Sequence, residues 1–118
     1  MSETRTQRVA DQIQREIASL LTNGQLKDPR LGFVTITGVE VTADFMEAKV
    51  YFVAHGSDAE VEGTREALVD NAGKMRSHLG RAMRIHHAPE LRFVQDPSID
   101  EGEKIDRLLK EVRDKEGW

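Results

Sequence analysis

The feature that most restricts the fold of this chain is the order in which two hydrophobic periods follow each other. Residues 5–22 carry apolar side chains at helical spacing, whereas residues 33–41 and 47–53 have the composition and alternation of strands. Helical spacing returns over residues 58–85, and a short strand set off by Pro89 is expected over residues 90–95. This order predicts an α+β domain, with a helix, a β-hairpin, a second helical region and a third strand.

The first helix and the hairpin have simple burial patterns. The helix is expected to pack through one apolar stripe, formed by Val9, Ile13, Ile17, Leu20 and Leu21. Gly24 ends it, because glycine enters the left-handed conformation at a helix end at little cost. In the second strand, Ala48, Val50 and Phe52 fall on one face. Gly38 in the first strand predicts a bulge or a bend.

The second helical region is too long to be one straight helix. Its apolar stripe runs over Val61, Leu68, Ala72, Met75, Leu79 and Met83. A single helix from Asp58 to Ile85 would be about 40 Å long, which overhangs a domain of this size. Gly73 also costs about 1 kcal/mol relative to alanine in a helix interior. We therefore predict two helices that meet at a kink near Gly73.

A further amphipathic helix is predicted near the C-terminus, followed by a short tail, together spanning about residues 99–118. Its apolar positions are Ile105, Leu108, Leu109 and Val112. Ser98 and Glu101 have the spacing of a capping box at its start. With no repeats and no low-complexity linker, we expect residues 1–118 to form a single domain.

Several classes of protein are disfavoured by what the sequence lacks. The absence of cysteine excludes disulfides, thiol catalysis and cysteine-ligated zinc. No apolar run approaches the roughly twenty residues of a membrane helix, and the N-terminus is not a secretory signal, so a cytoplasmic protein is expected. No nucleotide-binding or hydrolase motif occurs, and the side chains of His86 and His87 would not converge on one metal. We therefore expect no catalytic residue, metal, cofactor or small-molecule substrate.

The net charge of −4 conceals a basic segment. Residues 31–71 contain two basic and eight acidic residues, whereas residues 72–95 contain five basic residues and one acidic residue. On a helical projection, Lys74, His78, Arg81 and Arg84 lie opposite the apolar arc of Met75, Leu79, Ala82 and Met83, and Arg76 flanks that arc. This distribution fits either a solvated helix face or a surface that binds phosphate groups.

The absence of carboxylates favours the phosphate-binding interpretation. Residues 72–89 contain neither Asp nor Glu, although exposed helices ordinarily mix Glu with Lys to form pairs at i,i+4. The chain has four Phe, one Tyr and one Trp, too few for extensive base stacking. Recognition of the RNA backbone and its shape is therefore the favoured mode.

Three stretches carry a resemblance to a known family. They read RVADQIQREIASLL, then KDPRLGFVTITGVEVTADFMEAKVYF, then MRSHLGRAMRIHHAPELRFVQDPSIDEGEKIDRLL. Together they closely resemble the ribosome-binding factor A family, in order and spacing, from about Arg8 to Leu109. The most specific motifs are DPRLG ahead of a strand, LGRAMR ahead of a Pro-Glu-Leu strand, and Asp-x-Ser before the last helix.

The resemblance implies a type II KH-like fold, with a three-stranded sheet packed against helices. In that family an Ala-x-Gly kink replaces the GxxG loop of ordinary KH domains, and no two glycines here are three residues apart. This chain has Asn71-Ala72-Gly73 at the kink, with Asn where the family usually has Ala. The implied role is a monomeric assembly factor that binds the free 30S ribosomal subunit and 16S rRNA late in maturation. It would support processing of the 5′ end of the 16S precursor and matter most in the cold.

The charge pattern and the resemblance together predict one RNA-binding surface. The basic face of residues 74–84 would contact rRNA phosphates through Lys74, Arg76, Arg81 and Arg84. The exposed backbone at Gly73 would allow close approach, and further cations would extend the surface, namely Arg8, Lys27, Arg30 and Arg92. Two alternatives are a KH-like module for another RNA, and a protein–protein adaptor that uses the acidic hairpin and the C-terminal helix.

Overall fold

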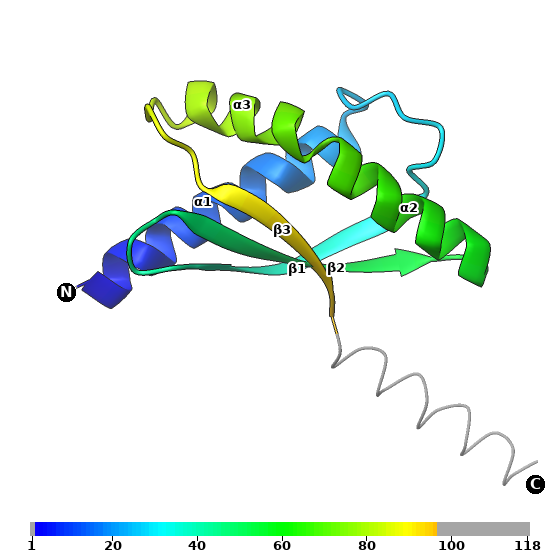
Figure 1. Ribbon diagram of the computed structural model, residues 1–118, viewed down its shortest axis with the longest axis horizontal. Helices are drawn as coiled ribbons and strands as arrows, with labels where there is room; N and C mark the ends of the chain where they lie inside the picture. Colours follow the sequence, from blue (N-terminus) through cyan, green and yellow to red (C-terminus); the bar gives the residue numbers. More distant parts are fainter. Residues whose placement is uncertain (1, 97–118) are drawn as a thin grey trace, which may run out of the picture.

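The computed structural model describes residues 2–96, which form three helices and one three-stranded sheet (Figure 1). In chain order the elements are α1 (Ser2–Thr22), β1 (Phe33–Val41), β2 (Glu47–His55), α2 (Asp58–Asp70), α3 (Ala72–Ala82) and β3 (Glu90–Gln95). The predicted α+β order is confirmed. The predicted helix and tail at about residues 99–118 lie outside the described residues, and the single domain over residues 1–118 stays a prediction.

The sheet has the strand order β1-β2-β3 and mixes two kinds of pairing. β1 and β2 form an antiparallel hairpin, whereas β3 pairs with β2 in parallel. A parallel neighbour requires a crossover, and α2 and α3 together supply it. The register of the hairpin shifts between Ile36 and Gly38, which confirms the irregularity predicted from Gly38.

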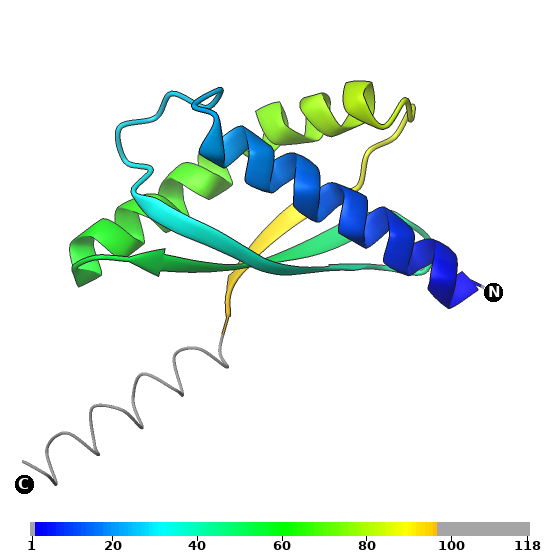
Figure 2. The ribbon, with the colours of Figure 1, turned by 180° about the vertical axis from the view of Figure 1, so that it is seen from behind.

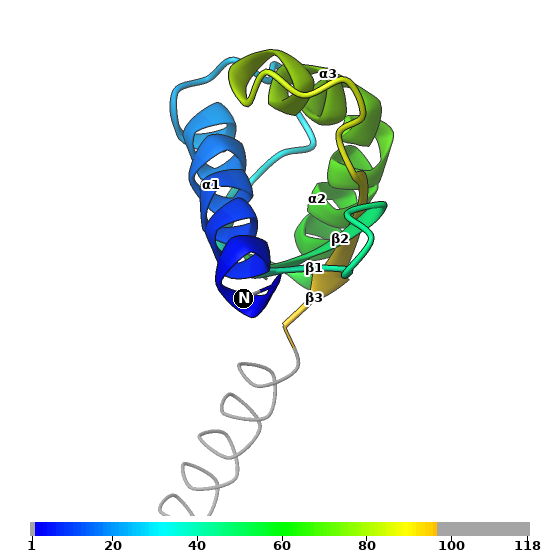
Figure 3. The ribbon, with the colours of Figure 1, turned by 90° about the vertical axis from the view of Figure 1, so that its left-hand side faces the viewer.

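All three helices lie on one face of the sheet (Figures 1 and 2). α1 packs on β1 and contacts α3, α2 packs on β2 and β3, and α3 packs on β3. In Figure 3 the sheet lies below, α1 and α2 stand over its two sides, and α3 spans the top. Within residues 2–96, no helix is both long and apolar enough to cross a membrane.

The core lies between the sheet and the helices, where the predicted stripes meet. Its fully buried side chains include Ile13, Ile17, Val50, Phe52, Leu68, Met75 and Leu79. The predicted inward face of β2 is confirmed, since Ala48, Val50 and Phe52 are all 0% exposed. Ala82 was predicted to face the core but is exposed, because α3 ends at this residue and the helical projection no longer applies.

Candidate nucleic-acid interface

The break between α2 and α3 lies at Asn71, the first residue of the predicted kink Asn71-Ala72-Gly73. Asn71 has φ −95° and ψ 2°, a conformation outside the helical region. Its backbone N–H still donates to Ala67 O (3.0 Å), and its carbonyl accepts from Met75 N (3.0 Å), so the interruption spans one residue. Gly73 belongs to α3 and is exposed, and its φ is not positive.

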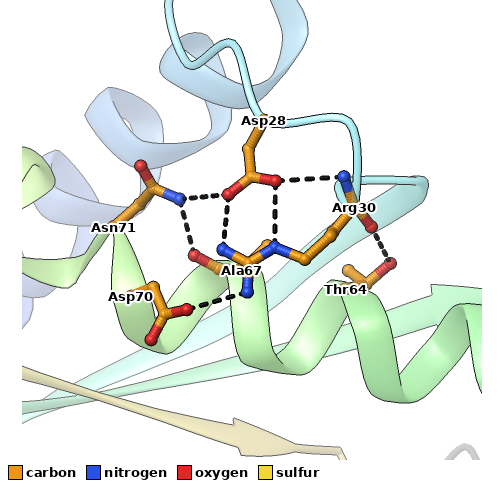
Figure 4. Close-up of polar contacts among 6 residues, drawn as sticks. All are labelled: Asp28, Arg30, Thr64, Ala67, Asp70 and Asn71. Carbon is orange, nitrogen blue, oxygen red and sulfur yellow. Dashed lines mark hydrogen bonds and ion pairs between the residues drawn. The ribbon is translucent and has the colours of Figure 1, made fainter.

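The side chain of Asn71 explains why the break occurs there. Its Nδ2 donates to Ala67 O at 2.8 Å and to Asp28 Oδ2 at 3.0 Å, and the residue is only 9% exposed (Figure 4). Asn favours such local contacts with the backbone over regular helix. The break is therefore attached to the loop of residues 23–32, which joins α1 to β1.

Arg30 in this loop is held by two carboxylates (Figure 4). Its Nε and NH2 donate to Asp28 at 3.1 and 2.7 Å, and its NH1 donates to Asp70 Oδ2 at 2.8 Å. The hydrogen bonds from Arg30 hold the pKa of the Asp28 carboxyl well below its usual range, and Asp28 in turn raises the pKa of Arg30. Because two carboxylates balance its charge, Arg30 adds less positive potential than its sequence position suggested.

All three Lys and Arg residues of α3 are exposed, and one of them also hydrogen-bonds to the backbone. Lys74 and Arg81 point to solvent. Arg76 donates from Nε to Ala88 O at 2.9 Å, so it also fixes the segment that leads into β3. His78, predicted on the same face, lies with Nε2 3.0 Å from Glu16 Oε2 and links α3 to α1.

Arg84 does not continue the helical face of α3, so that prediction is wrong. α3 ends at Ala82, and the chain then forms a Schellman motif, in which Ile85 N donates to Gly80 O (3.0 Å) and Arg84 N donates to Arg81 O (3.4 Å). Arg84 occupies the left-handed position of this motif, with φ 54°. The motif turns the chain back toward β3, which a helix extending to residue 85 would not allow.

Two adjacent concavities flank α3, and Arg76 lines both of them. The first, of about 590 Å³, runs between the helix break and β3 and is lined by Val69, Ala72, Gly73, Arg76, Glu90, Leu91, Arg92 and Phe93. The second, of about 530 Å³, lies at the end of α3 and is lined by Arg76, Ser77, Gly80, Arg81, Ile85, His86, His87 and Ala88. The structure thus places Gly73 and three of the predicted cations, Arg76, Arg81 and Arg92, along one path.

The predicted cations outside α3 differ in how close they lie to this path. Arg92 lines the first concavity, and its NH1 is 3.7 Å from Glu47 Oε1, a loose surface pair. Arg8 is exposed on α1, and Lys27 is exposed in the loop that contains Arg30. The predicted RNA-binding surface is therefore concentrated on α3 and β3, and Lys27 and Arg8 lie on other elements.

Some lining residues were not expected from the sequence. His86 and His87, expected to be surface histidines rather than metal ligands, are exposed and line the second concavity. Within residues 2–96, no group of three His, Cys, Asp or Glu side chains is placed to hold a metal ion. Leu91 and Phe93 give the first concavity apolar walls, which only the pairing of β3 with β2 reveals.

These observations define the class of the protein. A three-stranded sheet with helices on one face, and a helix–break–helix element beside the last strand, is an α+β domain of the type II KH-like class. The model of the ribosome-binding factor A family matches residues 5–109, and the chain belongs to that family.

Relatives and solved structures agree with this assignment. The ribosome-binding factor A of Desulforamulus reducens is 48% identical over 112 residues, covering 95% of this chain and 92% of the relative. The crystal structure of ribosome-binding factor A from Thermus thermophilus is similar with a TM-score of 0.67 and 27% identity, covering 76% of this chain and 93% of that one.

A second structure adds the context of a complex. It is a homology model of the Thermus thermophilus ribosome binding factor A, fitted into the cryo-EM map of a complex with the 30S subunit. It is similar to this chain with a TM-score of 0.60 and 28% identity, covering 72% of this chain and 88% of the other.

Proposed function

We propose that this protein is a small-subunit assembly factor that binds immature, free 30S particles through 16S rRNA. It supports late maturation of the subunit and processing of the 5′ end of the 16S precursor. It acts as a monomer in the cytoplasm, by binding rather than by catalysis. Membership of the ribosome-binding factor A family and the 30S complex of the Thermus thermophilus relative support this proposal.

One observation of this chain carries the proposal. The stretch of residues 72–89 has no carboxylate, and it folds so that Lys74 and Arg81 are exposed while Arg76 and Arg81 line adjoining concavities. Such a surface attracts phosphate groups and releases counterions on binding. Affinity for the subunit should therefore fall steeply as the salt concentration rises.

The first turn of α3 adds a place where RNA can approach the backbone closely. Gly73 is exposed, and no heavy atom lies within 4 Å of the position that a Cβ would occupy. A phosphodiester segment can thus lie against α3 at this point, with Lys74 beside it. Binding by shape and charge would hold an immature rRNA conformation, and the protein would leave when the mature conformation no longer fits.

The test is sedimentation of the full-length protein with free 30S subunits and with whole ribosomes, at two salt concentrations. We expect co-sedimentation with free subunits, and Arg81→Ala/Arg84→Ala should reduce the salt slope by roughly two units, about one for each lost phosphate contact. The matched control is Arg15→Ala/Lys49→Ala, which removes the same charge from exposed positions on α1 and β2. Equal slopes for the two double variants would remove Arg81 and Arg84 from the interface.

The alternatives give different results in the same experiment. A KH-like module for another RNA would bind unrelated RNA as tightly as 30S subunits. A protein–protein adaptor would stay bound after nuclease treatment and show little dependence on salt. In cells, loss of the protein should cause 16S rRNA with an unprocessed 5′ end to accumulate, most strongly in the cold.

A further inference from the structure

The loop of residues 23–32 is fastened to the helices at several points. Leu26 and Leu31 pack against the core on either side of Asp28. Thr64, a fully buried residue of α2, accepts a hydrogen bond from Gly32 N at 3.2 Å. Asp28 Oδ2 accepts a hydrogen bond from Asn71 Nδ2 at 3.0 Å, at the junction of α2 and α3. The loop therefore has a defined position relative to the first turn of α3.

The contact between Asp28 and Asn71 joins two places that carry cations. Lys27 precedes Asp28 in the loop, and Lys74 follows Asn71 by three residues in α3. Both lysines are exposed, whereas Asp28 is only 14% exposed at its side chain and Asn71 is 9% exposed. The two partly hidden residues are thus placed to fix the spacing of two cations that solvent, or RNA, can reach.

We propose that Asp28 and Asn71 are positioning residues: their contact holds the loop bearing Lys27 against the start of α3 bearing Lys74, so that both cations meet one RNA backbone. This inference rests on the proposed function. The link is made by the side chain of Asn71, so it depends on this residue and not on the backbone break alone.

For one substitution, electrostatics alone and the positioning role predict opposite changes in RNA-binding affinity. Removing the Asp28 carboxylate takes away a negative charge and releases Arg30, both of which would strengthen binding to RNA. If Asp28 positions the loop, its removal instead weakens binding. The direction of the change therefore separates a positioning role from a charge effect.

Asp70 provides a matched control. It also pairs with the Arg30 guanidinium, at 2.8 Å, and no hydrogen bond joins its side chain to Asn71 within the described residues. Asp28→Ala and Asp70→Ala therefore change the net charge equally and each removes one partner of Arg30. We expect Asp28→Ala to bind free 30S subunits roughly fivefold more weakly than the native protein, the scale of one net hydrogen bond, while Asp70→Ala binds as well or better.

Asn71→Ala tests the same contact without changing charge, and a double substitution tests whether Lys27 depends on it. Lys27→Ala should weaken binding in the native background, and its effect should shrink in the Asn71→Ala background, because the loop is no longer held in place. A general loss of stability would lower affinity without this dependence. Far-UV circular dichroism and thermal unfolding of each variant establish that it is folded at the temperature of the assay.

Every outcome decides the proposal. It is overturned if the native protein binds 30S subunits and Asp28→Ala binds as tightly as Asp70→Ala, or if the effects of Lys27→Ala and Asn71→Ala simply add. If Asn71→Ala does not fold, the comparison of the two aspartate variants decides alone. Failure of the native protein to bind 30S subunits would be a different result, and would reject the proposed function itself.

Discussion

Asn71 and Asp28 lie 43 positions apart in the chain, and a 3.0 Å hydrogen bond joins the amide of one to the carboxylate of the other. The same carboxylate accepts from the backbone N–H and the guanidinium of Arg30. One partly buried carboxyl thus connects a loop, a helix break and an arginine. All of these contacts favour its ionised form.

Acid should therefore destabilise the protein through Asp28. Its pKa lies below the ordinary value, chiefly through the side-chain hydrogen bonds of Arg30. A carboxyl whose pKa is lower in the folded than in the unfolded chain stabilises the fold above the unfolded value of about 4, and that stabilisation is lost as the pH falls below it. In urea unfolding between about pH 6 and pH 3, Asp28→Asn should show a shallower loss of stability than the native protein. Glu66→Gln is the exposed control. If Asp28→Asn loses stability with falling pH as steeply as this control and the native protein, the prediction is contradicted.

Arg76 should stabilise the fold in addition to any contact with RNA. Removing its side chain leaves the carbonyl of Ala88 without the 2.9 Å hydrogen bond from Nε, at a residue that is 7% exposed. Arg76→Ala should lower the free energy of unfolding by about 1–2 kcal/mol, measured by chemical denaturation. Arg81→Ala, with the same change of charge at an exposed position, should cost less, and equal losses would argue against a structural role for Arg76.

Arg84→Gly should raise stability and weaken binding at once. The left-handed φ of 54° is costly for arginine and natural for glycine, so the variant should gain about 0.5–1 kcal/mol in unfolding free energy. Loss of the cation should reduce affinity for 30S subunits, most clearly at low salt. Arg84→Ala shares the loss of charge and lacks the backbone benefit. A gain in stability for the alanine variant as large as for the glycine variant would contradict the argument.

Gly73→Ala should separate helix stability from access to the backbone. A methyl group at this position meets no heavy atom within 4 Å, so the variant should be more stable by up to about 1 kcal/mol. The same methyl group would obstruct RNA that approaches α3 closely, and 30S binding should weaken. Gly63→Ala on α2 is the matched control, because the heavy atom nearest to its new Cβ is Arg30 O, at 3.9 Å. If both variants bind 30S subunits equally well, close approach at Gly73 is not required.

The helices, the hairpin and most of the core were predictable because their signals are local. The spacing of Ile13 and Ile17, and the alternation through Val50 and Phe52, report burial directly, and all four are 0% exposed. The start of α2 was also readable, since Ser57 and Glu60 have the capping-box spacing and do cap each other. The capping box predicted at Ser98 and Glu101 lies outside the described residues.

The details of the candidate site depended on partners distant in sequence. The kink was predictable to within Asn71, Ala72 and Gly73, but the hydrogen bond from the Asn71 amide to Asp28, 43 positions away, was not. Arg30 looked available from its neighbours alone, but the second carboxylate that holds it, Asp70, is 40 residues away. Helical projection placed Arg84 on the basic face, because the apolar periodicity of the sequence gives no sign of the Schellman motif that ends α3.

Within residues 2–96, β3 is the last element to be synthesised, yet it adds Leu91 to the core and forms one wall of the concavity beside the helix break. Its parallel pairing with β2 joins segments separated by both α2 and α3, so its loop-closure entropy cost exceeds that of the β1-β2 hairpin. A nascent chain that stops before residue 90 has the cationic helix but no wall opposite it. The surface proposed to bind RNA is therefore complete only when β3 has joined the sheet, after both helices of the crossover.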